Sequence, residues 1–373
     1  MKIAIEARGL AGRAGIRTYV RQLLHHLMQQ RSGNAIEVWH AKKDTISQFP
    51  DVTSINVPLA HELLVPWWLN HSIPQTIRSR KPDLIHFTKA DVPRRKRIPT
   101  VVTIYDVIPL QLPSSQTFIR REYWPMALAR AVEESDHIIT ISQASKRSIV
   151  THLGADPARI TVTPLAVDTD HFKPTPRRLR ELTHPYILFV GQRDPKKNLK
   201  ALIHAFSHIA PHIPHTLVLA GKSAHNNVDV VALARRYRVQ DRVHVMTDVA
   251  YADLPALYSG ADLFVFPSII EGWGFPPHEA MACGTPVVVS NADPLPEVVG
   301  DASSVVTFST DEIPERLLDT TFVERLASEM GSILGNPAQQ QEMSQRGIVQ
   351  AAKNTWQAVA AQTLDVYRKV HTI

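Results

Sequence analysis

The sequence predicts an α/β protein of two units, each a parallel β-sheet with helices in its crossover connections. Short β-branched apolar runs alternate with longer helical patterns along the chain, which is typical of parallel sheets. The alternation pauses in a stretch rich in Pro and charge, residues 173–185, and then restarts. A chain of 373 residues is also large for one hydrophobic core. We therefore predict domains over residues 1–178 and 179–354, followed by a last helix over 355–373.

The first domain is expected to alternate strands with helices. Runs of Val, Ile, Thr and aromatic residues predict strands at 2–7, 36–41, 83–88, 100–105, 137–142 and 160–165. Apolar residues at helical spacing predict helices over 18–30 and 121–135.

The second domain is expected to repeat this arrangement. Strands are predicted at 186–191, 216–221, 243–247, 262–268, 285–290 and 304–308, with helices over 198–210 and 355–370. Two such units joined by a short linker are expected to leave a cleft between them. Ligands of parallel sheets bind at the carboxyl ends of the strands, so the chemistry is expected in the loops there.

Composition predicts a globular, cytoplasmic protein. Hydrophobic residues make up 44% of the chain and charged residues 20%, an ordinary balance, and no apolar run reaches the roughly 18 residues of a membrane span. The first ten residues include Glu6 and no apolar core of a signal peptide. Cys283 is the only cysteine, which excludes an intramolecular disulfide.

The net charge of +6 is unevenly distributed. Residues 1–183 carry 26 Lys and Arg against 16 Asp and Glu, a net charge of +10, which leaves −4 for the remainder. A basic half attracts nucleic acid, an anionic membrane or a phosphorylated ligand, or it is simply a solvated surface. No recognised nucleic-acid motif accompanies the charge. We therefore expect no nucleic-acid partner, and peripheral contact with an anionic membrane or a diphosphate-linked lipid acceptor.

Two glutamates eight positions apart, Glu271 and Glu279, flank a loop rich in Gly and Pro. Glu271 follows the strand predicted at 262–268, and Glu279 is expected in the first turn of the next helix. The loop glycines allow unusual backbone angles, and the helix start would offer N–H groups to an anion. One interpretation is a site for a diphosphate flanked by sugar hydroxyls. The other is a structural turn in which Glu279 stabilises the helix start.

This region resembles a known family. The stretch EGWGFPPHEAMACGTPVVVSNADPLPEVVGDAS is similar to the signature region of retaining, two-domain nucleotide-sugar glycosyltransferases of family 4. Further segments extend the resemblance over nearly the whole chain: GRAGIRTYVRQLL, KPDLIHF, TVVTIYDVIPL, SQASKRSIV and LFVGQRDPKKNLKALIHAF. The sequence most resembles the bacterial branch that includes mannosyltransferases of surface-polysaccharide assembly.

The resemblance implies the GT-B fold: two Rossmann-like domains facing a cleft, with the last helix returning to the first domain. It implies that Glu271 contacts the hydroxyls of the donor sugar and Glu279 the ribose of the nucleotide. The loop between them would approach the sugar and diphosphate. Two further positions in this domain, Gly221 and Val249, lie at the ends of other predicted strands. The implied donor-binding residues of the domain are thus Gly221, Val249, Gly272, Trp273, Gly274, Phe275, Pro276 and Glu279.

The run GQRDPKKN resembles the diphosphate-binding loop of the family. The family lysine falls on Lys197, where a cation would stabilise charge on the leaving diphosphate. The frequent family arginine is replaced by Gln192, and Arg193 is the expected substitute. Lys197, Arg193 and Glu271 are thus predicted catalytic residues. A solvated turn is the simpler interpretation of the lysines.

The first domain carries the remaining implied site residues. AGIRTYV resembles the Gly-rich loop of the family and places Gly15 near the donor, although Arg17 and Thr18 occupy its usual Gly-Arg positions. TIYDVIPL resembles an H-D-x-x-P segment. Asp106 matches its catalytic position, and Tyr105 stands where a donor-binding His is usual.

Several other side chains are expected to be structural. His86 and His278 have no Cys or carboxylate at metal-ligand spacing, so no metal and no cofactor are predicted. Trp67 and Trp68 are expected to pack at a helix edge, with contact to a lipid acceptor as the alternative. Cys283 is expected to be a packing residue, because no activating base is evident.

The resemblance predicts metal-independent transfer of a sugar, first choice mannose from GDP-mannose, to a hydroxyl of a saccharide or lipid-linked acceptor. Three alternatives stay open. Glu271 and Glu279 could serve a glycoside hydrolase; the fold also suits a nucleotide-sugar epimerase; and the departures at Tyr105 and Arg17 suit a catalytically impaired nucleotide-sugar-binding protein.

Overall fold

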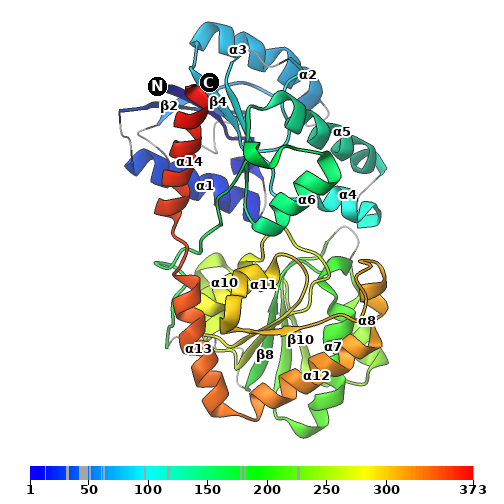
Figure 1. Cartoon of the computed structure of the whole chain (residues 1–373). Helices are drawn as coiled ribbons and strands as arrows, with labels where there is room; N and C mark the ends of the chain where they lie inside the picture. Colours follow the sequence, from blue (N-terminus) through cyan, green and yellow to red (C-terminus); the bar gives the residue numbers. More distant parts are fainter. Residues whose placement is uncertain are drawn as a thin grey trace. The chain divides into compact units, whose positions relative to one another are not determined.

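The computed structural model describes residues 1–372 apart from short gaps at 13, 31–32, 42–48, 50–51, 60, 62–63, 96–97, 116–117, 177–178, 180–181, 183 and 225–226. The side chains of 14, 115 and 118–120 are also outside the description. The contacts divide the chain into two units (Figure 1): Met1–Leu165 with Asn354–Ile373, and Ala166–Lys353. Each unit is an α/β sandwich around one parallel sheet, which confirms the predicted fold class.

The first unit holds a seven-stranded parallel sheet of order β3-β2-β1-β4-β5-β6-β7. Its strands are β1 Lys2–Glu6, β2 Ala35–His40, β3 Thr53–Asn56, β4 Leu84–Phe87, β5 Thr100–Thr103, β6 His137–Thr140 and β7 Ile160–Val162. Its helices are η1 Arg8–Ala11, α1 Ala14–Gln29, α2 Val65–Asn70, α3 Ser72–Arg80, α4 Ile108–Gln111, η4 Pro113–Ser115, α5 Phe118–Glu134, α6 Gln143–Leu153, η5 Pro157–Arg159 and α14 Trp356–His371.

The central strands are buried on both faces, which explains their continuous apolar runs. β4, β5 and β6 are buried at every position. β1 pairs in parallel with both β2 and β4, so the strand order reverses at β1. The carboxyl ends of β1 and β4 therefore form the switch point of this sheet.

The edge strand β3 was not predicted from the sequence. Its residues, TSIN, are exposed or only partly buried, so the run lacks the apolar pattern that marks the inner strands. It forms because β2 offers a free edge: Glu37, Val38, Trp39 and His40 pair with it in parallel.

The second unit holds a six-stranded parallel sheet of order β10-β9-β8-β11-β12-β13. Its strands are β8 Tyr186–Val190, β9 Thr216–Ala220, β10 Val243–Met246, β11 Leu263–Phe266, β12 Val287–Ser290 and β13 Ser304–Val306. Its α-helices are α7 Leu199–Ile209, α8 Val230–Arg236, α9 Leu254–Ser259, α10 Phe275–Ala282, α11 Leu295–Val299, α12 Thr320–Leu334 and α13 Pro337–Ala351. Its 3-10 turns are η6 Pro195–Lys197, η7 Ala210–His212, η8 Gln240–Arg242, η9 Tyr251–Asp253, η10 Gly300–Ala302 and η11 Glu315–Leu318.

The second unit begins earlier along the chain than the expected boundary after residue 178. The contacts change at Ala166, because the segment that follows packs on this unit. The His171 ring stacks on Tyr251 at a centroid distance of 4.1 Å, and the Thr175 amide donates to Ser259 Oγ at 3.2 Å. Part of the predicted linker, residues 177–178, 180–181 and 183, lies outside the described residues.

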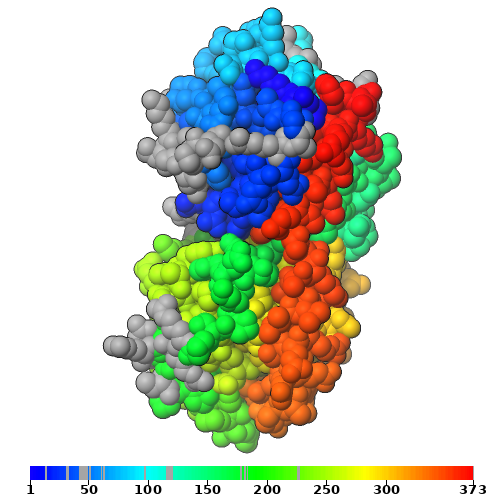
Figure 2. All heavy atoms as spheres, turned by 90° about the vertical axis from the view of Figure 1, so that its left-hand side faces the viewer, coloured from blue at the N-terminus to red at the C-terminus, as the bar shows by residue number. Residues whose placement is uncertain are grey.

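The last helix, α14, is part of the first unit (Figure 2), where it lies against α1. The Tyr367 hydroxyl is 2.6 Å from His86 Nδ1 on β4, and the Trp356 ring lies 6.4 Å from the Tyr19 ring on α1. The chain thus leaves the first unit at Leu165 and rejoins it at Asn354. Among the described helices, none combines the length and apolarity needed to cross a bilayer.

Candidate active site

The second sheet reverses its strand order at β8, which pairs with both β9 and β11. The loop after β8 contains η6, and the loop after β11 leads into α10. The two loops are joined where the Ile269 amide donates to the Lys196 carbonyl at 2.8 Å. This is the position at which open parallel sheets bind ligands, and the predicted catalytic residues of this unit lie in these loops.

Lys197 and Glu271 form an ion pair across these two loops. Lys197 Nζ lies 2.5 Å from Glu271 Oε1, and the two side chains are only 12% and 9% exposed. The ammonium also lies 4.7 Å from the centre of the Phe266 ring. The sequence placed both residues in one site but did not predict that they contact each other.

Burial and charge act in opposite directions on this pair. Burial alone would raise the pKa of Glu271, but the charges of Lys197 and Lys196 outweigh it and hold that pKa below its ordinary value. Burial lowers the pKa of Lys197, and the Glu271 carboxylate opposes this shift. Glu271 is therefore an ionised acceptor at neutral pH, held beside a desolvated cation.

Glu279 occupies a different environment from Glu271. Its Oε2 accepts a hydrogen bond from the Tyr258 hydroxyl at 2.7 Å. Burial raises the pKa of Glu279 to about 7, and the Tyr258 hydrogen bond only partly offsets the rise. The two glutamates therefore differ in protonation near neutral pH. Tyr258, on α9, was not identified from the sequence, because no motif connects it with a residue 21 positions later.

The prediction that Glu279 lies in the first turn of its helix is wrong. α10 begins at Phe275, so Glu279 is its fifth residue and the first turn carries no acidic residue. The helix starts early because Pro276 and Pro277 have the backbone angle of a first turn and need no N–H partner there. Glu279 is therefore held by its contact with Tyr258 rather than by the helix terminus.

The loop between the glutamates is shaped by Gly274. This residue has φ of +110°, and a Cβ there would lie 2.7 Å from Leu295 Cδ2. Trp273 is 4% exposed and packs 6.0 Å from the His278 ring, so its indole belongs to the core of the unit. Gly272, Phe275 and Pro276 are partly exposed and are the positions of this loop that a ligand can reach.

Arg193 connects two loops at the same edge of the sheet. Its Nη1 donates to the Gly221 carbonyl at 2.9 Å and its Nη2 to Ser223 Oγ at 2.6 Å, and the residue is 7% exposed. Gly221 itself lies against Gly191: a Cβ at Gly221 would be 2.0 Å from the Gly191 carbonyl oxygen. Arg193 thus positions the loop after β9. Val249 follows β10 at the same edge and is partly exposed.

The predicted site residues of the first unit follow β5 or begin α1. The Tyr105 hydroxyl donates to the Thr88 carbonyl at 2.8 Å, and its ring meets Tyr19 edge-on at 5.3 Å. Asp106 Oδ1 accepts from the Ile108 amide at 3.0 Å, at the start of α4. Gly15 is the second residue of α1. The phenol of Tyr105 is therefore engaged within its own unit.

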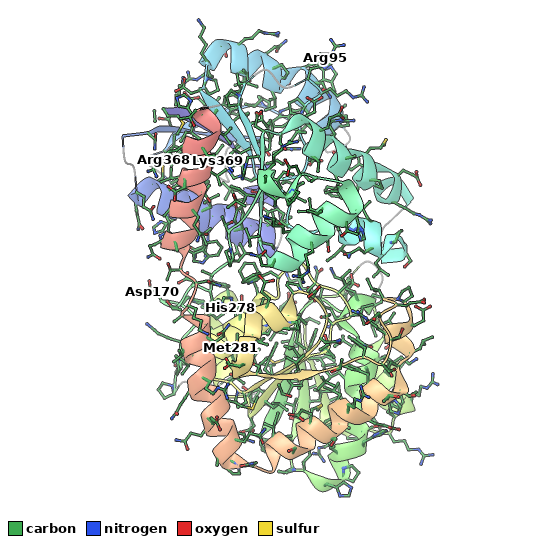
Figure 3. All side chains as sticks on the ribbon, viewed as in Figure 1. Arg95, Asp170, His278, Met281, Arg368 and Lys369 are labelled. Carbon is green, nitrogen blue, oxygen red and sulfur yellow. The ribbon has the colours of Figure 1, made fainter. Side chains whose placement is uncertain are left out.

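The residues expected to be structural are buried or packed. Both ring nitrogens of His86 contact hydroxyls, those of Tyr367 and Thr103, and burial lowers its pKa to about 3. His278 and Met281, labelled in Figure 3, lie one turn apart on α10, where Met281 packs against Gly347 of α13. Cys283 is 2% exposed, and burial raises the pKa of its thiol to about 12. No cluster of His, Cys, Asp and Glu suited to a metal occurs among the described residues.

The two tryptophans differ. Trp68 is fully buried and donates from Nε1 to the Val57 carbonyl at 3.0 Å, whereas Trp67 is 56% exposed and its ring stacks on His71. The expected packing at a helix edge therefore holds for Trp68 and not for Trp67.

Comparison with known proteins agrees with this architecture. The chain is similar to a sucrose-phosphate synthase from Thermosynechococcus elongatus with a TM-score of 0.78 and 21% identity, over 100% of this chain and 99% of that one. Two parallel-sheet units of this kind define the GT-B class of glycosyltransferases.

The family follows from the sequence matches. "Glycosyltransferase Family 4" matches residues 13–171, and "Glycosyl transferases group 1" matches residues 173–350. The chain is 26% identical to an O-antigen chain mannosyltransferase B of Escherichia coli, over 95% of this chain and 96% of that protein. It is 32% identical to an MMP alpha-(1->4)-mannosyltransferase of Mycolicibacterium hassiacum, over 67% of this chain and 58% of that protein. The chain belongs to the family 4 glycosyltransferases and is an enzyme of that class.

Proposed function

We propose that this enzyme transfers mannose from GDP-mannose to a hydroxyl of a saccharide or lipid-linked acceptor, with retention of the anomeric configuration and without a metal. The Lys197–Glu271 pair carries the proposal. It places a desolvated cation 2.5 Å from an ionised carboxylate at the switch point of the second sheet. The mannosyltransferases among the relatives support the choice of sugar.

The pair suits a donor that has both a diphosphate and a sugar. A diphosphate oxygen that reaches Lys197 replaces Glu271 as the partner of the ammonium. The freed carboxylate then accepts hydrogen bonds from hydroxyls of the donor sugar. The cation stabilises the charge that develops on the leaving diphosphate. This electrostatic interaction is stronger because the site excludes water. Arg193 supports the same edge by fixing the loop after β9.

The chemical step needs no protein nucleophile. The bond between the anomeric carbon and the diphosphate oxygen breaks, and the acceptor oxygen forms a bond to that carbon from the same face. The acceptor proton passes to the departing diphosphate oxygen. The protein contributes orientation and charge stabilisation, and Glu279 with Tyr258 holds the ribose end of the nucleotide.

Substitution of the pair tests this proposal. We expect Lys197→Ala and Glu271→Ala each to lower kcat/KM for sugar transfer by at least about 100-fold, the usual effect of losing one preorganised electrostatic group. Because each variant leaves the other charge buried, the double variant Lys197→Met/Glu271→Gln and a thermal unfolding curve separate lost chemistry from lost folding. Arg346→Ala, which removes an exposed cation of the same unit, is the matched control.

Thermal unfolding with added nucleotide sugars identifies the donor. Ligand binding raises the apparent stability of the protein, so GDP-mannose should give a larger thermal shift than UDP, ADP or dTDP sugars.

Three results would contradict the proposed function. Undiminished transfer by Glu271→Ala would remove Glu271 from the active site. Release of an epimerised nucleotide sugar without acceptor would favour the epimerase. Donor binding without turnover would favour a catalytically impaired protein.

A further inference from the structure

A cavity of about 490 Å³ lies beside the loop that carries Lys197, between the start of α7, helix α8 and η11. α7 and α8 are neighbours in the second unit (Figure 1). The volume falls within the range of small-molecule sites. Most of the wall is aliphatic, from Leu199, Val228, Leu233, Leu317 and Leu318. Leu318 is 71% exposed, so it presents a large apolar side chain to solvent.

One residue that lines the cavity, Asn198, has an unsatisfied amide. Asn198 is 1% exposed, and neither Oδ1 nor Nδ2 has a hydrogen-bond partner among the described residues. Its backbone is left-handed, with φ of +53°, and it makes no side-chain cap for α7. A buried polar group without a partner is costly, so a ligand atom that bonds this amide gains affinity from it.

The rim of the cavity is positive. Lys200 and Arg236 both line it, and neither forms an ion pair with a described carboxylate. The acidic residue on the wall, Asp229, is already engaged, because its Oδ1 accepts from the Ala232 amide at 2.9 Å and caps α8. An aliphatic wall, a free amide and two cations together match a molecule with one alkyl chain and an anionic head group.

We propose that this cavity binds a single-chain anionic amphiphile, with its chain against the leucines and its head group between Lys200 and Arg236. The amide of Asn198 is buried and unpaired within the described part of the chain, and rotation of this side chain toward the cavity lets Nδ2 donate to an oxygen of the head group. Asn198 directly follows Lys197, and the same loop is held to the β11 loop through the Lys196 carbonyl. A ligand that moves Asn198 therefore also biases the position of Lys197, so the amphiphile and the diphosphate nucleotide change each other's affinity by the same factor.

Calorimetric titration with dodecyl phosphate, below the concentration at which it forms micelles, tests the site. The wild-type protein should bind dodecyl phosphate at least tenfold more tightly than dodecyltrimethylammonium, and should not bind inorganic phosphate at the same concentrations. Ala232→Trp, which fills the cavity from an exposed helix position, should abolish binding. Val231→Trp is the matched control, because Val231 is 50% exposed on the same helix and does not line the cavity.

Two further variants test the polar contacts. Asn198→Gly keeps the left-handed backbone. It should lower the affinity for dodecyl phosphate about tenfold, which is the loss expected from roughly one hydrogen bond to a charged group. Arg236→Gln should lower the affinity for dodecyl phosphate at least fivefold. Equal affinity for the anionic and cationic amphiphiles, or binding that survives Ala232→Trp, would overturn the site.

The linkage is measured separately. Saturating dodecyl phosphate should change the GDP affinity of the wild-type protein at least fivefold and that of Ala232→Trp not at all. An unchanged GDP affinity in the wild type would refute the coupling. Amphiphile binding by a protein that binds no nucleotide would instead refute the proposed donor, so the two failures are distinct.

Discussion

Two carboxylates eight positions apart serve different purposes because their partners differ. Glu271 faces a cation, Lys197, and stays ionised. Glu279 faces a hydroxyl, that of Tyr258, and its buried carboxyl has a pKa raised to about 7. The same residue type is thus an acceptor at any physiological pH in one place and a group that titrates near neutrality in the other.

The raised pKa of Glu279 predicts a measurable pH dependence of stability. The folded state binds this proton more tightly than the unfolded state, in which the pKa is 4.5. The free energy of unfolding should therefore fall as pH rises from about 4.5 to 7, by about 3 kcal/mol in total from this group. Glu279→Gln removes the titration and still accepts from Tyr258.

Urea unfolding at pH 5 and pH 8 measures this difference. Glu279→Gln should gain stability relative to the wild-type protein between these two pH values. Parallel pH profiles of the two proteins would show that Glu279 titrates normally.

At the scale of elements, the site depends on how closely adjacent loops approach. Gly221 directly follows β9 with φ of +143°, and a Cβ there would be 2.0 Å from the Gly191 carbonyl oxygen after β8. The contacted atom belongs to the backbone, so it cannot move aside as a flexible side chain would. Arg193 then locks the two loops by donating to the Gly221 carbonyl.

This close approach predicts a large effect of Gly221→Ala. Overpacking together with the unfavourable φ should destabilise the protein by at least about 2 kcal/mol, and it should weaken nucleotide binding because the loop after β8 carries Lys197. Thermal unfolding and GDP titration measure the two effects.

Gly331→Ala is the matched control for this substitution. Gly331 lies within α12, and its added Cβ would meet only Ile209 Cγ2, at 3.7 Å. This change should stabilise the helix by up to about 1 kcal/mol. A mild effect of Gly221→Ala, similar to that control, would show that the loops can separate without cost.

At the scale of the whole molecule, charge is divided along the chain. The first 183 residues carry a net charge of +10 and the remainder −4. Leu64 and Trp67, at the start of the first unit's α2, are 46% and 56% exposed. Basic charge with exposed aromatic and aliphatic side chains favours adsorption to an anionic membrane surface, where a lipid-linked acceptor would be found.

Vesicle sedimentation tests this adsorption. At low salt the protein should bind vesicles containing phosphatidylglycerol at least fivefold more strongly than vesicles of phosphatidylcholine, and salt should weaken the difference because it screens charge. Trp67→Ala should reduce binding, whereas Val349→Ala, an exposed apolar residue of the second unit, should not. Equal binding to neutral vesicles would contradict an electrostatic interaction.

Much of the fold could be predicted because its signal is local. A strand buried on both faces requires a continuous apolar run, and every strand predicted from such a run is present. The missed strand, β3, is polar and partly exposed, so its pairing depends on the free edge of β2 rather than on its own residues. The second unit begins at Ala166 rather than after the predicted residue 178, because His171 and Thr175 contact residues far along the chain.

The sequence by itself determined the two parallel sheets, the loops in which Lys197 and Glu271 lie and the helix that carries Glu279, because periodicity and chain order fix which residues follow which strand. Only the tertiary structure decided their partners. The contacts of Lys197 with Glu271, Tyr258 with Glu279 and Arg193 with Gly221 join residues 21 to 74 positions apart. Such contacts depend on the paths of separate loops, and no local pattern of residue types encodes those paths.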